Sequence, residues 1–97
     1  MKESLLTKET FDLKTVFDIL KDLYKIKKSY AVAGKNDIDA FYNIISKESM
    51  KWIVNDINKL YKQKCKNADF VGKYKIPNEM KDINIISYFY KLYKEKL

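Results

Sequence analysis

The stretch from Ser49 to Lys66 carries a helical pattern on both of its sides. Its apolar residues recur at spacings of three and four, which is the periodicity of one face of an α-helix. These apolar residues are Met50, Ile53, Val54, Ile57, Leu60 and Tyr61. The opposite face holds lysine and asparagine, namely Lys51, Asn55, Asn58, Lys59, Lys62 and Lys66, with one acid, Asp56, beside it. The pattern predicts a helix that buries one side and presents ammonium and amide groups on the other.

The basic excess of the chain lies in its second half. Residues 1–48 contain nine lysines and eight acids, whereas residues 49–97 contain eleven lysines and five acids. A polyanion such as nucleic acid is the natural partner of such a region. All basic residues are lysine, however, and asparagine, isoleucine and tyrosine are frequent. An AT-rich genome produces the same bias, so solvated lysines without a binding role are the alternative interpretation.

The length of 97 residues, with 46% hydrophobic residues, predicts one compact domain. Two glycines and one proline signal few turns, which favours long helices. We expect a flexible arm at 1–9, a helix-turn-helix-like core with a strand at 10–77, and a C-terminal packing or dimerisation helix at 78–97. The expected fold class is mostly α with a small β component.

Five further elements are indicated along the chain. A helix over 11–28 would be capped by Thr10 or Asp12 and bury Leu13, Val16, Phe17, Leu20, Leu23 and Tyr24. Residues 29–34 lack helical spacing and predict a short strand, and a second helix follows over 37–46. Alternation over Phe70–Ile76 predicts a second strand, with 30–33 as its natural partner. Pro77 ends that strand, and Asn78 would cap a last helix over 79–96.

The last helix is apolar around more than half of its circumference. One stripe, formed by Ile83, Ile86, Tyr90 and Tyr93, suits a helix-to-helix seam and predicts a homodimer. Packing against the first helix of the same chain would explain the same stripe without a partner.

Catalytic residue types are largely missing. The sequence has no histidine, no arginine, no glycine-rich phosphate loop and no Cys-x-x-Cys pair. Cys65, the single cysteine, is expected to be a packing or solvent-edge residue near a helix end. We therefore expect no enzymatic activity, no catalytic or metal-binding residues, no cofactor and no small-molecule substrate. No apolar run is long enough to span a membrane, and a lone thiol suits a cytoplasmic location.

The order helix, short strand, helix, helix, strand resembles winged helix-turn-helix DNA-binding proteins, over about residues 11–96. The resemblance rests on element order, and a full wing has two strands after the third helix, whereas this sequence indicates one. It implies a winged-helix-like three-helix core with short strands and an added C-terminal helix. It also implies that Ser49–Lys66 is the recognition helix.

The expected function is that of a small DNA-binding accessory or regulatory protein of a plasmid, phage or other mobile element. Asn55 and Asn58 would reach base edges, and the basic contacts to duplex DNA would come from Lys51, Lys59, Lys62, Lys66, Lys73 and Lys75. The alternative is a protein-binding inhibitor or immunity-type module that docks through an aromatic surface. Trp52, which lies off the apolar stripe, is either an exposed anchor or, more commonly for such a position, partly buried.

Overall fold

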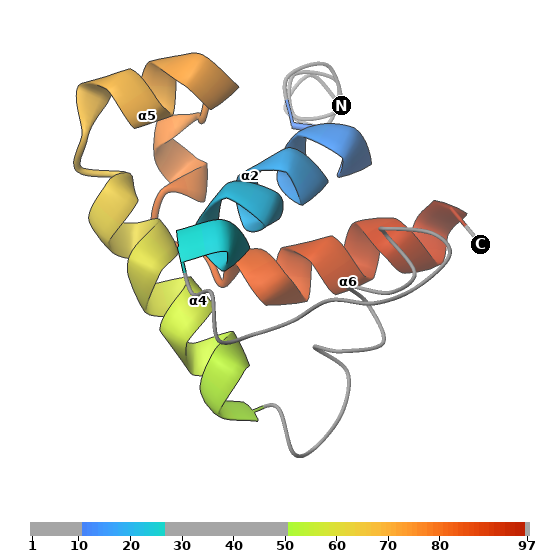
Figure 1. Ribbon diagram of the computed structural model, residues 1–97. Helices are drawn as coiled ribbons and strands as arrows, with labels where there is room; N and C mark the ends of the chain where they lie inside the picture. The colour runs from blue at the N-terminus through green and yellow to red at the C-terminus, as the bar shows by residue number, and fades with distance from the viewer. Residues whose placement is uncertain (1–10, 27–50, 97) are drawn as a thin grey trace.

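The computed structural model describes residues 11–26 and 51–96. In chain order, the elements are α2 (Leu13–Ile26), α4 (Lys51–Lys64), α5 (Ala68–Tyr74), the short 3-10 helix η2 (Asn78–Met80) and α6 (Ile85–Lys96). Helices α2, α4 and α6 pack against one another in all three pairs. Figure 1 shows α5 beyond the C-terminal end of α4, beside α2.

Helix α2 begins at Leu13, two residues after the predicted start, and Asp12 is the one of the two predicted caps that the structure uses. The Asp12 side chain caps it, because its Oδ1 accepts a hydrogen bond of 2.9 Å from the backbone N–H of Thr15. The predicted apolar stripe is buried from Val16 onward, and Leu13 is half-buried. Ile19, between the predicted positions, is also fully buried, so the core covers a wider arc of α2 than one stripe.

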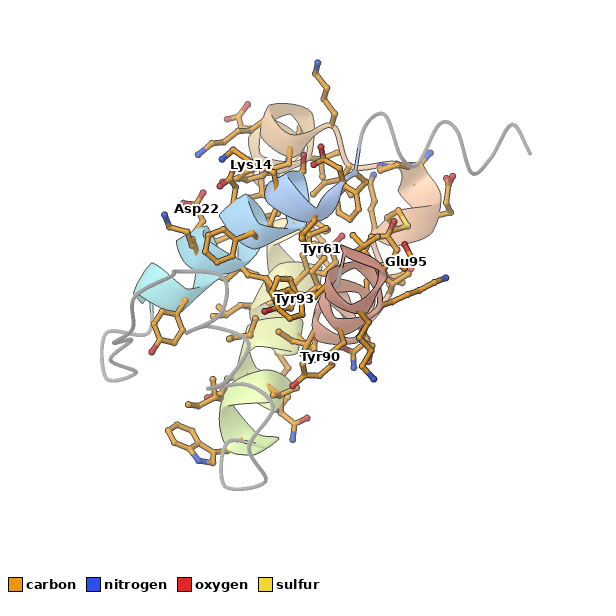
Figure 2. The ribbon with its side chains drawn as sticks, turned by 90° about the vertical axis from the view of Figure 1, so that its right-hand side faces the viewer. Lys14, Asp22, Tyr61, Tyr90, Tyr93 and Glu95 are labelled. Atoms are coloured by element: carbon orange, nitrogen blue, oxygen red, sulfur yellow. The ribbon has the colours of Figure 1, made fainter. Side chains whose placement is uncertain are left out.

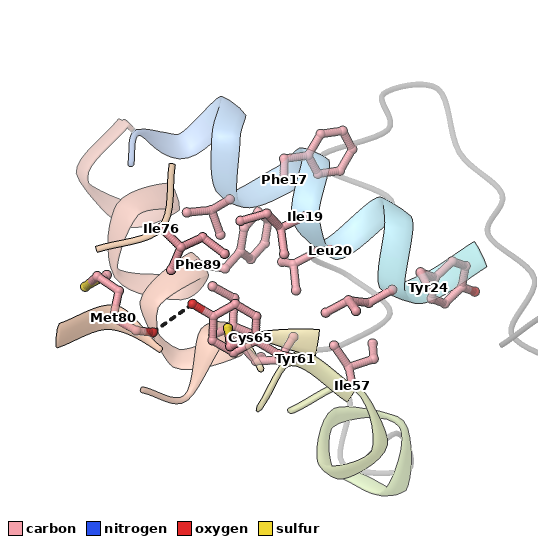
Figure 3. Packing of buried hydrophobic residues seen from close by; sticks show 14 of the residues in the cluster. Phe17, Ile19, Leu20, Tyr24, Ile57, Tyr61, Cys65, Ile76, Met80 and Phe89 are labelled. Atoms are coloured by element: carbon pink, nitrogen blue, oxygen red, sulfur yellow. Dashed lines mark hydrogen bonds between the residues drawn. The ribbon is translucent and has the colours of Figure 1, made fainter. Parts of the chain in front are cut away.

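The apolar stripe predicted for α4 faces the core, although Val54 and Leu60 are only half-buried and Met50 lies outside the described residues. Ile53, Ile57 and Tyr61, each four residues from the next, face the other helices. The core cluster comprises Phe11, Val16, Phe17, Ile19, Leu20, Leu23, Tyr24, Ile53, Ile57, Tyr61, Cys65, Ile76, Met80, Ile85, Ile86 and Phe89. The buried hydroxyl of Tyr61 donates a hydrogen bond of 2.7 Å to the backbone carbonyl of Met80 (Figure 3).

The predicted strand Phe70–Ile76 is wrong, because these residues belong to helix α5 and the turn that ends it. The Asn67 side chain starts the helix by accepting hydrogen bonds from the backbone N–H groups of Asp69 and Phe70, at 2.8 and 3.1 Å. Phe70 and Tyr74 are four residues apart, so they share a face of a helix as well as a face of a strand. Their rings pack edge to face with centroids 5.2 Å apart.

The end of α5 is a Schellman motif. Lys75 has the left-handed backbone conformation with φ 52°, and its N–H donates to the carbonyl of Gly72. The N–H of Ile76 donates to the carbonyl of Val71 at 3.0 Å, and the Ile76 side chain is buried. Pro77 follows, as it often does after such a cap.

The last helix begins later than the sequence pattern predicts. Asn78 starts η2 rather than a long helix, and the N-cap of α6 is Asn84, whose Oδ1 accepts a hydrogen bond of 3.0 Å from the N–H of Ser87. The intervening turn brings Met80 into the core beside Tyr61. Asn78 and Asn84 are both residue types that favour an N-cap. Because Met80 packs in the core, the long helix starts at the second of them, Asn84.

The expected fold class, mostly α with a small β component and a winged-helix-like arrangement, is corrected by these findings. Every regular element in 11–26 and 51–96 is helical, and no strand follows α4. The strand predicted for the wing, Phe70–Ile76, is instead helix α5 and the turn that ends it, so these residues form no wing. The predicted arm at 1–9, strand at 29–34 and helix at 37–46 lie outside the described residues.

Candidate nucleic-acid interface

The side of α4 opposite the core is exposed and basic. Asn55, Lys59 and Lys62 follow one another at spacings of four and three, and Lys66 continues the series in the turn after the helix. All four side chains are exposed, and we call this set the lysine face. Gln63, four residues after Lys59, is exposed beside it, and that spacing is the signal that identifies it. Lys51 is the first residue of α4, and its side chain lies outside the described part of the structure.

The lysines of this face differ from other exposed lysines in their partners. Lys14 lies 3.5 Å from the carboxylate of Asp18, one turn along α2. Among the described residues, no carboxylate lies within ion-pair distance of Lys59, Lys62 or Lys66. Three ammonium groups are thus presented to solvent without neutralisation, which makes this face a local source of positive potential.

Asn58, a predicted base-contacting residue, is not on the lysine face. It is half-buried, and its Oδ1 accepts a hydrogen bond of 3.4 Å from the backbone N–H of Ile86, in the first turn of α6. Its amide therefore joins α4 to α6. Of the two predicted base-contacting asparagines, Asn55 is the one that faces solvent.

Lys73 lies on α5 and Lys75 is the residue that caps its C-terminal end, so neither lies on a strand. Lys73 is 3.2 Å from a carboxylate oxygen of Asp22 and lies over the ring of Tyr74, with 5.0 Å to its centroid. The hydroxyl of Tyr74 donates a hydrogen bond to the same carboxylate oxygen. These contacts tie α5 to the outer side of α2, where Figure 2 shows Asp22 pointing away from α6. The Asp22 carboxylate raises the pKa of Lys73, which stays charged but is neutralised locally. The exposed Lys75 side chain follows in the cap of α5.

The stripe predicted as a dimer seam takes part in the core of a single chain. Ile86 is 1% exposed, and Ile83, Tyr90 and Tyr93 are half-buried against the core cluster. The rings of Tyr93 and Phe89 are stacked with centroids 5.9 Å apart. Figure 2 shows Tyr61 and Tyr93 among the packed helices. These contacts lie within one chain, as the alternative interpretation of the stripe requires, and the homodimer stays a prediction.

Trp52 is exposed rather than partly buried. Of the large hydrophobic side chains that the structure describes, it alone is exposed, at 53%. It lies three residues before Asn55 and seven before Lys59, so it extends the outward side of α4 at the N-terminal end.

Nucleophile and metal chemistry find no support in the described residues. Burial raises the pKa of the Cys65 thiol, which keeps it protonated, and the residue packs in the core, as the sequence predicts. Burial also raises the pKa of Tyr61, whose hydroxyl is a hydrogen-bond donor in the core. Within 11–26 and 51–96, no group of three or more histidine, cysteine or acidic side chains could hold a metal ion.

Comparison with protein-family models, with curated protein sequences and with solved structures returned no match. None of the helices in the described ranges is both long and apolar enough to cross a membrane. Within the part of the chain that the structure describes, the lysine face of α4 is the strongest candidate for a functional site.

Proposed function

We propose that this protein is a non-enzymatic DNA-binding protein of accessory or regulatory type, which contacts duplex DNA through the lysine face of α4. One observation carries the proposal. Lys59, Lys62 and Lys66 are exposed on the side of α4 opposite the core, without a carboxylate partner among the described residues. Phosphate groups would supply the missing negative charge and release their counterions.

The dimensions of α4 suit a duplex groove. A helix with its side chains is about 10–12 Å across, and the major groove of B-DNA is about 12 Å wide. The lysine face extends about 16 Å from Asn55 to Lys66 at the helical rise per residue. In that position, the Asn55 amide would meet base edges, where asparagine pairs bidentately with adenine, and the lysines would meet phosphates.

Salt dependence is the first test. If three lysines each neutralise one phosphate, the affinity for a duplex falls by roughly 40-fold between 50 and 200 mM salt, from a log–log slope of about −2.7. The measurement is fluorescence anisotropy with a labelled duplex of about 20 base pairs. An affinity that stays constant over this salt range would contradict the proposal.

Charge reversal tests the location of the interface. Lys59→Glu with Lys62→Glu places two acids on the lysine face, and we expect the affinity for duplex DNA to fall by more than tenfold. The matched control is Lys91→Glu with Lys94→Glu, which reverses two exposed lysines at the same spacing on α6. This control changes the net charge equally, so an equal loss in both variants would show that binding follows total charge rather than this face.

The alternative function, a protein-binding module with an aromatic surface, has less support. Tyr88 packs on Phe11 with ring centroids 5.6 Å apart, and Tyr93 stacks on Phe89, so the aromatic residues of α6 serve the core. The exposed Trp52 is the remaining feature in its favour. A function of that kind would survive the double charge reversal on α4, which separates it from DNA binding.

A further inference from the structure

Three side-chain amides lie on α4, and the structure uses one of them. Asn58 is half-buried, and its Oδ1 accepts a hydrogen bond from the backbone N–H of Ile86. The side chains of Asn55 and Gln63 are exposed and make no hydrogen bond with any residue that the structure describes. A side-chain amide has two donor hydrogens and an acceptor oxygen, so Asn55 and Gln63 each present a complete hydrogen-bonding edge to a ligand.

Asn55 and Gln63 belong to one row of side chains on the outward side of α4. They are eight residues apart with Lys59 midway between them, so the three residues follow an i, i+4, i+8 ridge of the helix. The two amides are about 12 Å apart along the axis and about 80° apart around it, so both can face one groove. Because the base-pair rise of duplex DNA is about 3.4 Å, this separation corresponds to about three to four base pairs.

We propose that Gln63 reads a second base pair, so that the preferred duplex has two A·T pairs about three to four base pairs apart. The inference rests on the proposed function, because the groove must receive the lysine face before either amide meets a base. In the major groove, adenine offers N7 as an acceptor and its N6 amino group as a donor, and the amide of asparagine or glutamine pairs with both.

Lys59 lies between the two amides without taking their place. Its ammonium group ends a flexible four-carbon stem, so it can turn from the ridge towards a phosphate at the edge of the groove. Lys62 and Lys66, in the neighbouring row, are also exposed and suited to phosphates. The lysines would therefore hold α4 in the groove, and the amides at the two ends of the row would discriminate between bases.

The test is a selection from a pool of duplexes with a randomised central sequence, carried out with the full-length protein. We expect two positions that favour A·T, about three to four base pairs apart. Replacing either A·T pair by G·C should weaken binding roughly tenfold in fluorescence anisotropy, within the range for one bidentate contact to a base. Replacing either adenine by 7-deaza-adenine, which lacks the N7 acceptor, should also weaken binding, because the contact lies in the major groove.

The variants assign each position to one side chain. Gln63→Ala should abolish the preference at one position, and Asn55→Ala should abolish it at the other. Gln63→Glu should move the first preference from adenine to cytosine, because a carboxylate accepts a hydrogen bond from the N4 amino group of cytosine. The matched control, Asn78→Ala, removes an exposed amide outside α4 and should leave both preferences unchanged. Circular dichroism establishes that each variant retains its helices.

Each contrary result has one meaning. Duplex binding without this pair of A·T positions, or with two preferences that both persist in Gln63→Ala, overturns this inference and leaves the proposed function standing. Failure of the wild type to bind any duplex in the pool overturns the proposed function, and this inference with it.

Discussion

Single residues on α4 have different roles that depend on which side of the helix they occupy. Asn55 and Asn58 carry the same amide and are three residues apart, yet Asn55 faces solvent and Asn58 bonds to the backbone of α6. The helical rotation between them places Asn58 at the edge of the packed face. Of these two asparagines, only Asn55 is exposed, so the proposed contact to a base is assigned to Asn55.

Tyr61 links the core to the segment that follows α5. Its ring is fully buried, and its hydroxyl donates to the carbonyl of Met80, 19 residues later (Figure 3). This hydrogen bond satisfies a buried donor and holds η2 against α4. A purely apolar side chain of similar size would fill the space but leave the Met80 carbonyl without this donor.

We expect Tyr61→Phe to lower the free energy of unfolding by about 1–2 kcal/mol, because it removes a buried hydrogen bond and leaves its acceptor unpaired. Urea denaturation followed by circular dichroism measures the change. The control is Tyr88→Phe, which removes a hydroxyl for which the described residues offer no hydrogen-bond partner, and which should cost less than about 0.5 kcal/mol. Equal losses in the two variants would contradict a special role for the Tyr61 hydroxyl.

At the scale of elements, the boundaries of the helices are set by local hydrogen bonds. The side chains of Asp12, Asn67 and Asn84 each accept from a backbone N–H in the first turn of the following helix. Helix α5 has seven residues and is additionally joined to α2 by Tyr74 and Lys73 through Asp22. A helix this short needs such tertiary contacts, because helices of its length are marginal alone.

The start of α6 gives a prediction at this scale. Asn84→Ala should lower the free energy of unfolding by about 1 kcal/mol, because it removes the side-chain cap of the helix. Asn78→Ala removes an exposed asparagine that makes no cap hydrogen bond and should change stability by less than about 0.5 kcal/mol. Thermal or urea denaturation compares the two variants. A larger loss in Asn78→Ala would place the cap where the sequence pattern alone predicts it.

For the whole molecule, the burial of weak acids makes the folded state less stable as the pH rises into the alkaline range. Burial raises the pKa of Tyr24, Tyr61, Cys65, Tyr74 and Tyr88. In the unfolded chain, the thiol loses its proton near pH 8.5 and the tyrosines near pH 10. Above these values the unfolded state binds fewer protons than the folded state, so stability falls as pH rises.

We therefore expect the urea midpoint to be constant from pH 7 to 8 and to fall progressively between pH 8.5 and 10.5. Cys65→Ala should flatten the earlier part of this decline, because the variant no longer has a buried thiol to deprotonate. Circular dichroism at a series of pH values provides the midpoints. A midpoint that does not change up to pH 10.5 would contradict the burial of these groups.

The sequence predicts α2 and α4 well because their apolar spacing is local and long enough to exclude a strand. Phe70 and Tyr74 misled the prediction because a spacing of four satisfies both a strand and a helix. A strand also needs a partner for its backbone groups, whereas α5 forms its hydrogen bonds internally. The lysine side of α4 follows from the same helical spacing, but Asn58 could be assigned only once the position of α6 was known.

The sequence by itself determined two buried helical stripes, the excess of lysine in the second half and the basic side of α4, because each depends on residue order within a few turns. Tertiary structure decided that Lys73 is neutralised by Asp22, that the α6 stripe packs within one chain, and that Trp52 remains exposed at the end of the lysine face. These outcomes depend on contacts between residues 28 or more positions apart, or on what the packed helices leave uncovered. Local periodicity does not indicate which residues far apart in the sequence come into contact. The packing of α2, α4 and α6 determines those contacts.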